Sequence, residues 1–528
     1  MTGCLTHLMG DLSTDARLNV VVAMVMSLVF TIVAAPFARA AYHRRVQRLM
    51  TFREVRSPPA PWWVRREGHV GRSAIAANVI EAEHPAELAQ TMRYRLQRIR
   101  RATFVAYVAF AVGTVFSTPL HSGAAAEFAI AAAALGIGPA LVNATPRTIP
   151  RFIAVLVIAL LSIAMTFDRF KDFASITFGV GLVFAFYLIG TNRTLRALSV
   201  PLFLIGFGAF LGIFVASNLQ LGLRRCFAPL DEVRNAIVLA EVVFVSFIAF
   251  GILAANRLIA GLARLYERGW VSDISLVFLL GTALSAALAC FWPDREDVSL
   301  TAMAAACVIW VSLTVSAYVI ALHASPWPAG ARSLLVLRVF SHSRHSDRLL
   351  DQIQTTWRYA GPILQIGGPD LARLNINPYV FTLFLGMKTH ELFLPGEVTK
   401  EDLFSRLDLA PDREGRFRIV EVFCFDTAWR STVQKLIETS DVILLDLRGF
   451  NAQRAGAGFE LEQLASLGRL DRTVVIGDRT TDWSYFEGLA GTKAKSVVRL
   501  DAHAPHLVDS CVMALLQQSV HTALSPNS

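Results

Sequence analysis

The chain has 528 residues, of which 54% are hydrophobic and 17% charged, and its formal net charge is +9. Its mean hydropathy of +0.48 is too apolar for a soluble protein of this length. Residues 1–330 carry 28 basic and 18 acidic side chains, whereas residues 331–528 carry 22 and 23. The positive charge therefore belongs to the apolar half, where lipid headgroups are the natural partner, and no nucleic-acid footprint is visible.

Apolar segments long enough to cross a bilayer, about 20 residues each, fill the region 1–325. We predict nine transmembrane helices, at 18–40, 103–120, 125–144, 151–168, 173–191, 197–217, 236–256, 271–292 and 299–322. The first also resembles a signal peptide, because Ala38-Arg39-Ala40 is similar to a cleavage site. We favour a retained helix, since the preceding residues are not basic and the apolar run is long.

The placement of arginine predicts the orientation. Between residues 44 and 101 there are thirteen Arg and five Asp or Glu. Short loops keep their basic residues on the cytoplasmic side. Later arginines fall in alternate loops: Arg147 and Arg151, Arg193 and Arg196, then Arg257, Arg264 and Arg268. We predict a multi-pass cell-membrane protein with its N-terminus outside, and with the basic loop 41–101 and the C-terminal domain in the cytoplasm.

The membrane half offers few chemical groups. Glu241 is the one acid well inside a predicted helix, and it is either a cation site or a residue near the outer interface. Gly208 and Gly212 form a GxxxG pair, which packing within one chain explains best. Residues 86–101 read as a helix that runs into the second apolar segment. The six cysteines have no metal-ligand spacing, so no metal site is predicted.

After Pro326, Pro328 and Gly330 the pattern changes to alternating strands and helices over residues 331–528. We predict strands at 333–340, 362–366, 418–425, 441–447, 472–476 and 496–500, and helices at 346–359, 427–438, 458–467 and 505–519. Residues 371–417 read as an insertion with short helices around 400–407. Continuous apolar strands between helices are typical of a parallel, doubly wound α/β sheet.

Ligands of such sheets bind beyond the carboxyl ends of the strands. The predicted strands there lead into loops rich in polar residues and glycine. Eleven candidate ligand-binding residues follow from this rule: Ser341, His342, Arg344, Gly367, Gly368, Asp370, Asp426, Trp429, Arg448, Asn451 and Asp478.

Several of these residues also have a purely structural interpretation. Asp426 suits the N-cap of the helix that follows it. The glycines at 367 and 368 suit a turn. Asp446, inside a predicted strand, needs a partner, which either Arg448 or Arg338 can supply.

Two stretches carry a family resemblance. LRVFSHSRHSD at 337–347 resembles the opening strand and loop of TIR-like domains. DTAWRSTVQKLIETSDVILLDLRGF, followed by GFELEQL, resembles their later core, so that the likeness covers about 150 residues. In many TIR domains a Glu-Leu pair holds the glutamate that cleaves NAD. The resemblance places Glu460 there, as a carboxylate beside a developing oxocarbenium ion. The segment before it is Gly456-Ala457-Gly458-Phe459 in place of the usual aromatic–cysteine element.

The whole pattern also resembles bacterial multi-spanning proteins with a "DLRGF" cytosolic domain, and the scarcity of lysine fits a GC-rich bacterial genome. Three functions fit. The first is a membrane-anchored signalling or sensing protein whose TIR/flavodoxin-like domain binds NAD or a related nucleotide, or assembles as a homo-oligomer. The second is an NAD glycohydrolase that uses Glu460. The third is a transporter with a regulatory domain, which the shortage of intramembrane charge disfavours.

Overall fold

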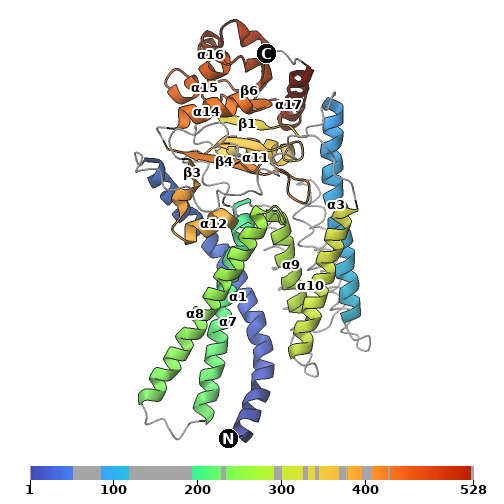
Figure 1. Cartoon of the computed structure of the whole chain (residues 1–528), viewed down its shortest axis with the longest axis vertical. Coiled ribbons are helices and arrows are strands. Elements are labelled where there is room, and N and C mark those ends of the chain that lie inside the picture. The colour runs from blue at the N-terminus through green and yellow to red at the C-terminus, as the bar shows by residue number, and fades with distance from the viewer. Residues whose placement is uncertain are drawn as a thin grey trace. The chain divides into compact units, whose positions relative to one another are not determined.

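The structure is a computed structural model of the whole chain (Figure 1). It describes residues 2–51, 85–117, 193–226, 234–290, 300–324, 331–338, 344–367, 376, 378–394, 403, 407–425 and 428–524. The chain divides into two compact units. Unit 1 comprises Met1–Ala40, Ile99–Ser325 and Ile376–Thr382, and unit 2 comprises Ala41–Arg98, Pro326–Asn375 and Leu383–Ser528.

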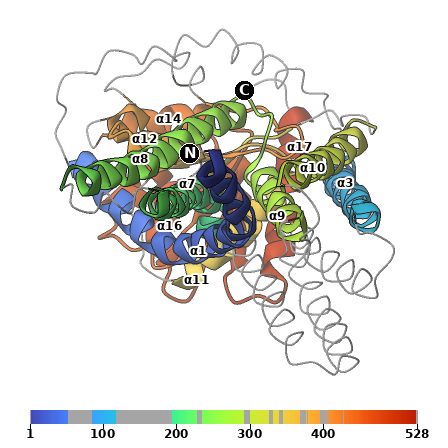
Figure 2. The same ribbon diagram turned by 90° about the horizontal axis from the view of Figure 1, so that it is seen from below.

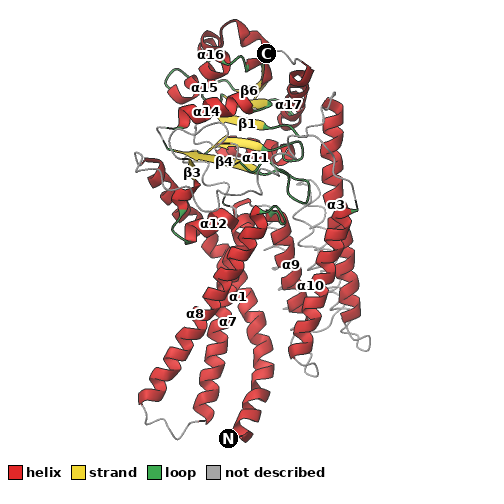
Figure 3. Ribbon diagram, in the orientation of Figure 1, coloured by secondary structure: helices red, strands yellow, loops and turns green. Residues whose placement is uncertain are grey.

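The described part of unit 1 is built mainly from long apolar helices (red in Figure 3). Their bounds, with the portions of α1 and α3 that belong to unit 2, are α1 Thr2–Thr51, α3 Pro85–Ser117, α7 Arg193–Cys226, α8 Arg234–Glu267, α9 Asp273–Cys290 and α10 Leu300–His323. Among the described residues, four helical stretches are long and apolar enough to cross a membrane: Asn19–Met50, Leu198–Ser217, Glu241–Glu267 and Ala304–His323. They coincide with predicted segments 18–40, 197–217, 236–256 and 299–322.

The other predicted segments have different outcomes. Segment 271–292 lies on α9, where Ser275–Leu284 forms a shorter apolar helix. Segment 103–120 lies on α3, which is described as far as Ser117. The remaining predicted segments fall outside the described residues: 125–144, 151–168 and 173–191.

Two predicted loops begin later than expected, because helical hydrogen bonding continues past the apolar run. α1 runs to Thr51, so its last residues are helix rather than part of a loop from residue 41. α8 continues to Glu267, which places Arg257 and Arg264 on a helix. Arginine is a good helix former, and it lets a helix leave the apolar region without unwinding. The helix predicted for 86–101 is confirmed as the first half of α3.

α7 and α8 pack closely side by side, as both views show (Figures 1 and 2). A Cβ added to Gly208 would collide with the carbonyl of Gly251, and the reverse collision would also occur. A Cβ on Gly212 would lie 2.7 Å from the carbonyl oxygen of Phe247. The GxxxG pair therefore lets two helix backbones of one chain approach, as predicted.

Unit 2 contains a seven-stranded sheet in which every pairing is parallel. The strands are β1 Leu334–Arg338, β2 Ile363–Ile366, β3 Phe393–Leu394, β4 Ile419–Cys424, β5 Val442–Asp446, β6 Thr473–Gly477 and β7 Val498–Asp501. Their order is β3-β4-β2-β1-β5-β6-β7. All six predicted strands are present. The additional strand, β3, has only two residues, which is too short for a sequence pattern to reveal.

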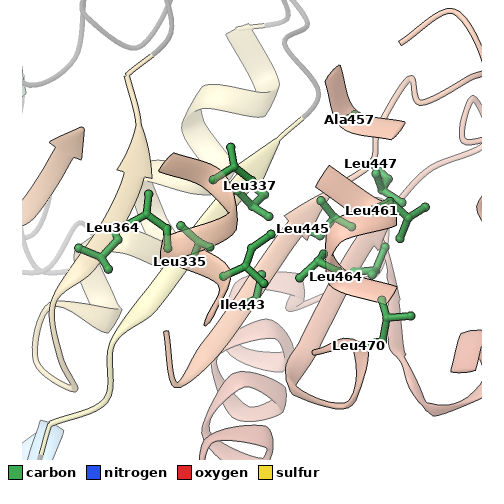
Figure 4. Packing of buried hydrophobic residues seen from close by; sticks show 14 of the residues in the cluster. Leu335, Leu337, Leu364, Ile443, Leu445, Leu447, Ala457, Leu461, Leu464 and Leu470 are labelled. Carbon is green, nitrogen blue, oxygen red and sulfur yellow. The ribbon is translucent and has the colours of Figure 1, made fainter. Parts of the chain in front are cut away.

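Helices cover both faces of this sheet. They are α11 Arg344–Trp357, α14 Trp429–Thr439, α15 Ala455–Ser466, α16 Trp483–Ala490 and α17 Leu507–Leu524, while α12 Pro378–Leu385 lies in the insertion. The sequence signalled neither α12 nor α16. One core joins α14, α15 and α16 to alternate strand residues such as Leu335 and Leu445 (Figure 4). The other joins α11 and α17 to Val336 and Leu444. This alternation makes a three-layer α/β/α unit.

The second core also takes residues from far upstream. Leu88 and Met92, on the first turns of α3, are buried with Trp357 of α11 and Leu515 of α17. The α/β unit therefore includes chain from 41–98 as well as from the predicted domain 331–528.

Candidate functional site

The strand order reverses between β1 and β5. From β1 the chain passes to β2 and β4 on one side, then returns to β5, β6 and β7 on the other. Counted without β3 and β4, the order is 2-1-3-4-5, one of the two common doubly wound arrangements. At such a reversal the two adjacent connections lead away on opposite faces, so their loops separate and leave a place for a ligand beyond the carboxyl ends. The candidate site is therefore the carboxyl end of β1 and β5.

Three charged side chains come from residues at or just beyond the carboxyl ends of β1 and β5. Arg338 ends β1 and is paired in register with Asp446, which ends β5. Both are buried, at 6% and 3% exposure. Arg448 forms a bidentate ion pair with Asp446. Its Nε lies 2.8 Å from Oδ1 and its Nη2 lies 2.5 Å from Oδ2. The sequence left open whether Arg448 or Arg338 pairs with Asp446, and the bidentate partner is Arg448. Two arginines and one aspartate make up this cluster.

Asp478, beyond β6, organises the loop rather than projecting from it. Its Oδ1 accepts hydrogen bonds from the amide and hydroxyl of Thr480, at 2.9 and 2.6 Å. Burial alone would raise the pKa of Asp478, but hydrogen bonds from Thr480, Gly449 and Thr481 outweigh it and lower the pKa. Thr481 also donates to the carbonyl of Leu447 at 2.9 Å, which ties this loop to the one after β5.

Two other predicted ligand-binding residues, Asn451 and Gly367, make contacts close to their own place in the fold. Asn451 is exposed, and its side-chain oxygen accepts from the amide of Gln453 at 3.0 Å. Gly367 continues the β2–β4 pairing, and a Cβ there would lie 2.7 Å from the ring of Phe423. Close packing, rather than a turn alone, therefore explains Gly367.

Trp429 belongs to an aromatic cluster at the start of α14. Its ring meets Phe459 of α15 edge-on, with 5.2 Å between centroids. The guanidinium carbon of Arg430 lies 5.6 Å from the Trp429 ring centroid and 5.3 Å from that of Phe459. Both rings are half-buried and pack against the first core, so the cluster joins α14 to α15.

Glu460 lies on α15 and is 5% exposed. Its Oε2 is buried without a hydrogen-bond partner, and burial raises the pKa of its carboxyl to about 8. The helix begins at Ala455, so Glu460 is in the second turn. The helix predicted for 458–467 would have placed Glu460 in the first turn, but the small residues of 455–458 extend the helix upstream, so the helix dipole favours a negative charge at Glu460 less. At neutral pH most of the Glu460 carboxyl is protonated.

The remaining predictions are placed as follows. Arg344 begins α11, and its side chain is outside the described residues. The candidates wholly outside them are Ser341, His342, Gly368, Asp370 and Asp426. Asp426 is not the N-cap of α14, because the helix starts at Trp429 and its N-cap is Ala428.

Sequence reasoning missed the roles of Arg430, Phe459 and Thr481. Phe459 and Arg430 were detectable as an aromatic and a cation beside named candidates. Thr481 was not, because its partner Leu447 is 34 residues away in the chain.

Comparison of the chain with protein-family models, with curated proteins and with solved structures finds no match. Within the described part of the chain, no group of three or more His, Cys, Asp or Glu side chains is suited to hold a metal ion. The findings support a chain with helices apolar enough to cross a membrane and an α/β unit with a parallel sheet.

Proposed function

We propose that this chain is a membrane-embedded sensor whose cytoplasmic α/β domain binds an anionic, nucleotide-type ligand at the carboxyl ends of β1 and β5. The observation that carries the proposal is the reversal of strand order at the point where Arg338, Asp446 and Arg448 gather. The bidentate pair holds Arg448 in a defined orientation, and guanidinium groups such as those of Arg338 and Arg448 are suited to bind phosphate. The resemblance of the surrounding segments to TIR-like domains points to the same ligand class.

The exposed faces of two helices support the proposed orientation. On α1 the exposed side chains change from apolar, as at Phe37, which is 72% exposed, to basic, as at Arg44. On α3 they change from basic, as at Arg101, to apolar, as at Phe104, which is 66% exposed. Such a change from apolar to basic marks the level at which a helix leaves the hydrocarbon region. Arg44 on α1 and the α3 arginines up to Arg98 belong to the α/β unit, whereas Arg101 belongs to unit 1. Basic residues favour the cytoplasmic side.

A sensor fits the described helices better than an ion-coupled transporter. In α7, α9 and α10, the described buried polar side chains are Ser199, Thr282 and Thr314, and none of them is ionisable. Glu241 is exposed on α8, which supports a residue near the interface rather than an internal cation site. Transporters usually hold charged groups inside the bundle.

A second candidate function is NAD cleavage by Glu460. It is favoured by the Glu-Leu resemblance together with the buried carboxyl, whose Oε2 has no hydrogen-bond partner. To stabilise an oxocarbenium ion the carboxyl must be ionised and must reach the ribose. In the structure the carboxyl is buried, and its raised pKa keeps it protonated. Catalysis would therefore require α15 to move when the ligand binds.

The test uses the full chain in detergent micelles. Binding of NAD, ADP-ribose and ATP is measured by calorimetry, and NAD consumption is followed separately. The double variant Asp446→Asn, Arg448→Gln removes both members of the ion pair, so that neither of these two side chains is left as an unpaired charge. The matched control, Glu487→Gln with Arg499→Gln, removes a pair with a 2.9 Å separation elsewhere in the domain.

We expect at least one of these nucleotides to bind the wild type and the control, with an affinity about tenfold or more lower for the double variant at the switch point. Equal binding by both variants would refute this location of the site. Consumption of NAD that Glu460→Gln abolishes would establish the second candidate. A folded chain that binds none of the three nucleotides would refute the ligand proposal, and its oligomeric state would then be measured to test self-association.

A further inference from the structure

The first turns of α3 are fixed to the α/β unit by more than apolar packing. Nη1 of Arg95 donates to the carbonyl oxygen of Tyr359 at 2.6 Å. Its guanidinium carbon also lies 5.1 Å from the centroid of the Phe417 ring. Arg95 is 2% exposed, so these contacts hold a buried cation. The same helix continues past Arg98 into the apolar segment without a break.

Phe417 is itself held at the end of α11. Its amide donates to the carbonyl of Arg358 at 2.8 Å, and Nε of Arg358 donates back to the carbonyl of Phe417 at 2.6 Å. Phe417 is the last residue but one of the segment 407–418, which leads into β4. The position of this segment therefore decides whether the Phe417 ring is available to Arg95.

The same segment buries two acids. Asp412 and Glu414 are each 2% exposed. Oδ1 of Asp412 accepts from the amides of Glu414 and Arg416, at 3.2 and 3.1 Å. The side chain of Arg416 lies between the two acids, 4.0 Å from Asp412 and 3.9 Å from Glu414. Oδ2 of Asp412 is buried and accepts no hydrogen bond. These contacts are too long and too few to offset the burial of a full negative charge.

The charged groups that face Asp412 come from two elements. Glu414, Arg416 and Arg418 lie on its own segment, and Arg358 and the titratable Tyr359 directly follow α11. Burial, and after it the charge of Glu414, raises the pKa of Asp412 to about 7, although the three arginines lower it.

We infer that segment 407–418 is a pH-sensitive joint between the α/β domain and α3, closed while Asp412 carries a proton and loosened when that proton passes to solvent. The sign follows from linkage. The closed state holds the proton more tightly than the open state, so closure is favoured at low pH and weakens as pH rises towards and through 7. Opening displaces Phe417 and removes the surface on which Arg95 lies. Cytoplasmic pH thereby reaches a helix that continues into the apolar segments, whether or not the nucleotide proposal holds.

Hydrogen exchange of the full chain in lipid nanodiscs tests this inference. Exchange of the amides of 85–98 and 407–418 is measured from pH 6 to pH 8 and corrected for the intrinsic pH dependence of exchange. The pKa of Asp412 is about 7 when segment 407–418 is closed and has its ordinary value when the segment is open. The equilibrium constant for opening therefore rises about tenfold from pH 6 to pH 8 and then levels off.

Two variants make the test specific. Asp412→Asn keeps an oxygen acceptor for the two amides but cannot ionise, so protection should stay high and independent of pH. Arg95→Gln should release 85–98 at every pH while 407–418 keeps its response. The control Glu487→Gln, which removes an exposed ion pair, should behave as the wild type.

A wild type whose corrected protection does not change between pH 6 and 8 overturns the inference. So does a response that survives in Asp412→Asn. Should Asp412→Asn fail to fold, the wild-type titration and Arg95→Gln still decide the matter, because the inference requires both segments of the wild type to loosen with the same midpoint.

Discussion

Replacing Glu460 by glutamine should stabilise the protein, and the gain should grow with pH. The carboxyl is buried on α15, and its pKa is raised from an ordinary value of 4.5 to about 8 by burial. Glutamine has the same shape and stays neutral. The substitution therefore removes a group that must be kept protonated in the folded state and leaves the packing around Leu461 and Leu464 in place.

The magnitude follows from the two pKa values. Below pH 4.5 the carboxyl is protonated in both the folded and unfolded chain, so the charge costs nothing. Between 4.5 and about 8 the unfolded chain releases the proton and the folded chain keeps it, which lowers the free energy of unfolding by about 1.4 kcal/mol per pH unit. The full interval corresponds to about 5 kcal/mol, and relaxation around the charge reduces this to about 2–5 kcal/mol.

Thermal unfolding of the full chain in detergent, followed by tryptophan fluorescence at pH 5, 6.5 and 8, measures the effect. We expect Glu460→Gln to raise Tm by about 4–10 °C at pH 8 and by no more than about 2 °C at pH 5. Glu462→Gln, on the exposed face of the same helix, should leave Tm unchanged at each pH. A Glu460→Gln protein that is no more stable than the wild type at pH 8 would refute the reasoning, because Glu460 would then be ionised and paired.

The glycine contacts give two further predictions. Gly208→Ala should lower Tm of the detergent-solubilised protein by an amount equivalent to about 1–3 kcal/mol, since the added Cβ meets the α8 backbone. Gly261→Ala on α8 has open space and should be neutral or slightly stabilising, so equal losses in both would contradict the close crossing. Gly477→Ala should lower the stability by a similar amount, because its Cβ would collide with the Trp483 ring. Gly488→Ala, also in open space, should leave the stability unchanged. Trp483 fluorescence and Tm measure the difference.

Local patterns were sufficient to predict the class of the fold. Strands of the α/β unit are continuous apolar runs, as in β5, and that signal depends only on neighbours in the chain. The apolar segments on α1, α7, α8 and α10 are equally local, because crossing a bilayer requires length and composition alone. For the same reason the change to strand–helix alternation near residue 330 is visible in the sequence.

The tertiary structure decided what depends on distant pairs. The strand order, with β1 beside β5, determines where the candidate site lies, and no single strand encodes it. The choice of Arg448 as the bidentate partner of Asp446 depended on side-chain geometry at the end of β5. The docking of Leu88 and Arg95 joins residues more than 240 positions from their partners. Glu460 shows the same limit, because its sequence neighbours suggest a helix position, while its burial and raised pKa arise from elements folded around it.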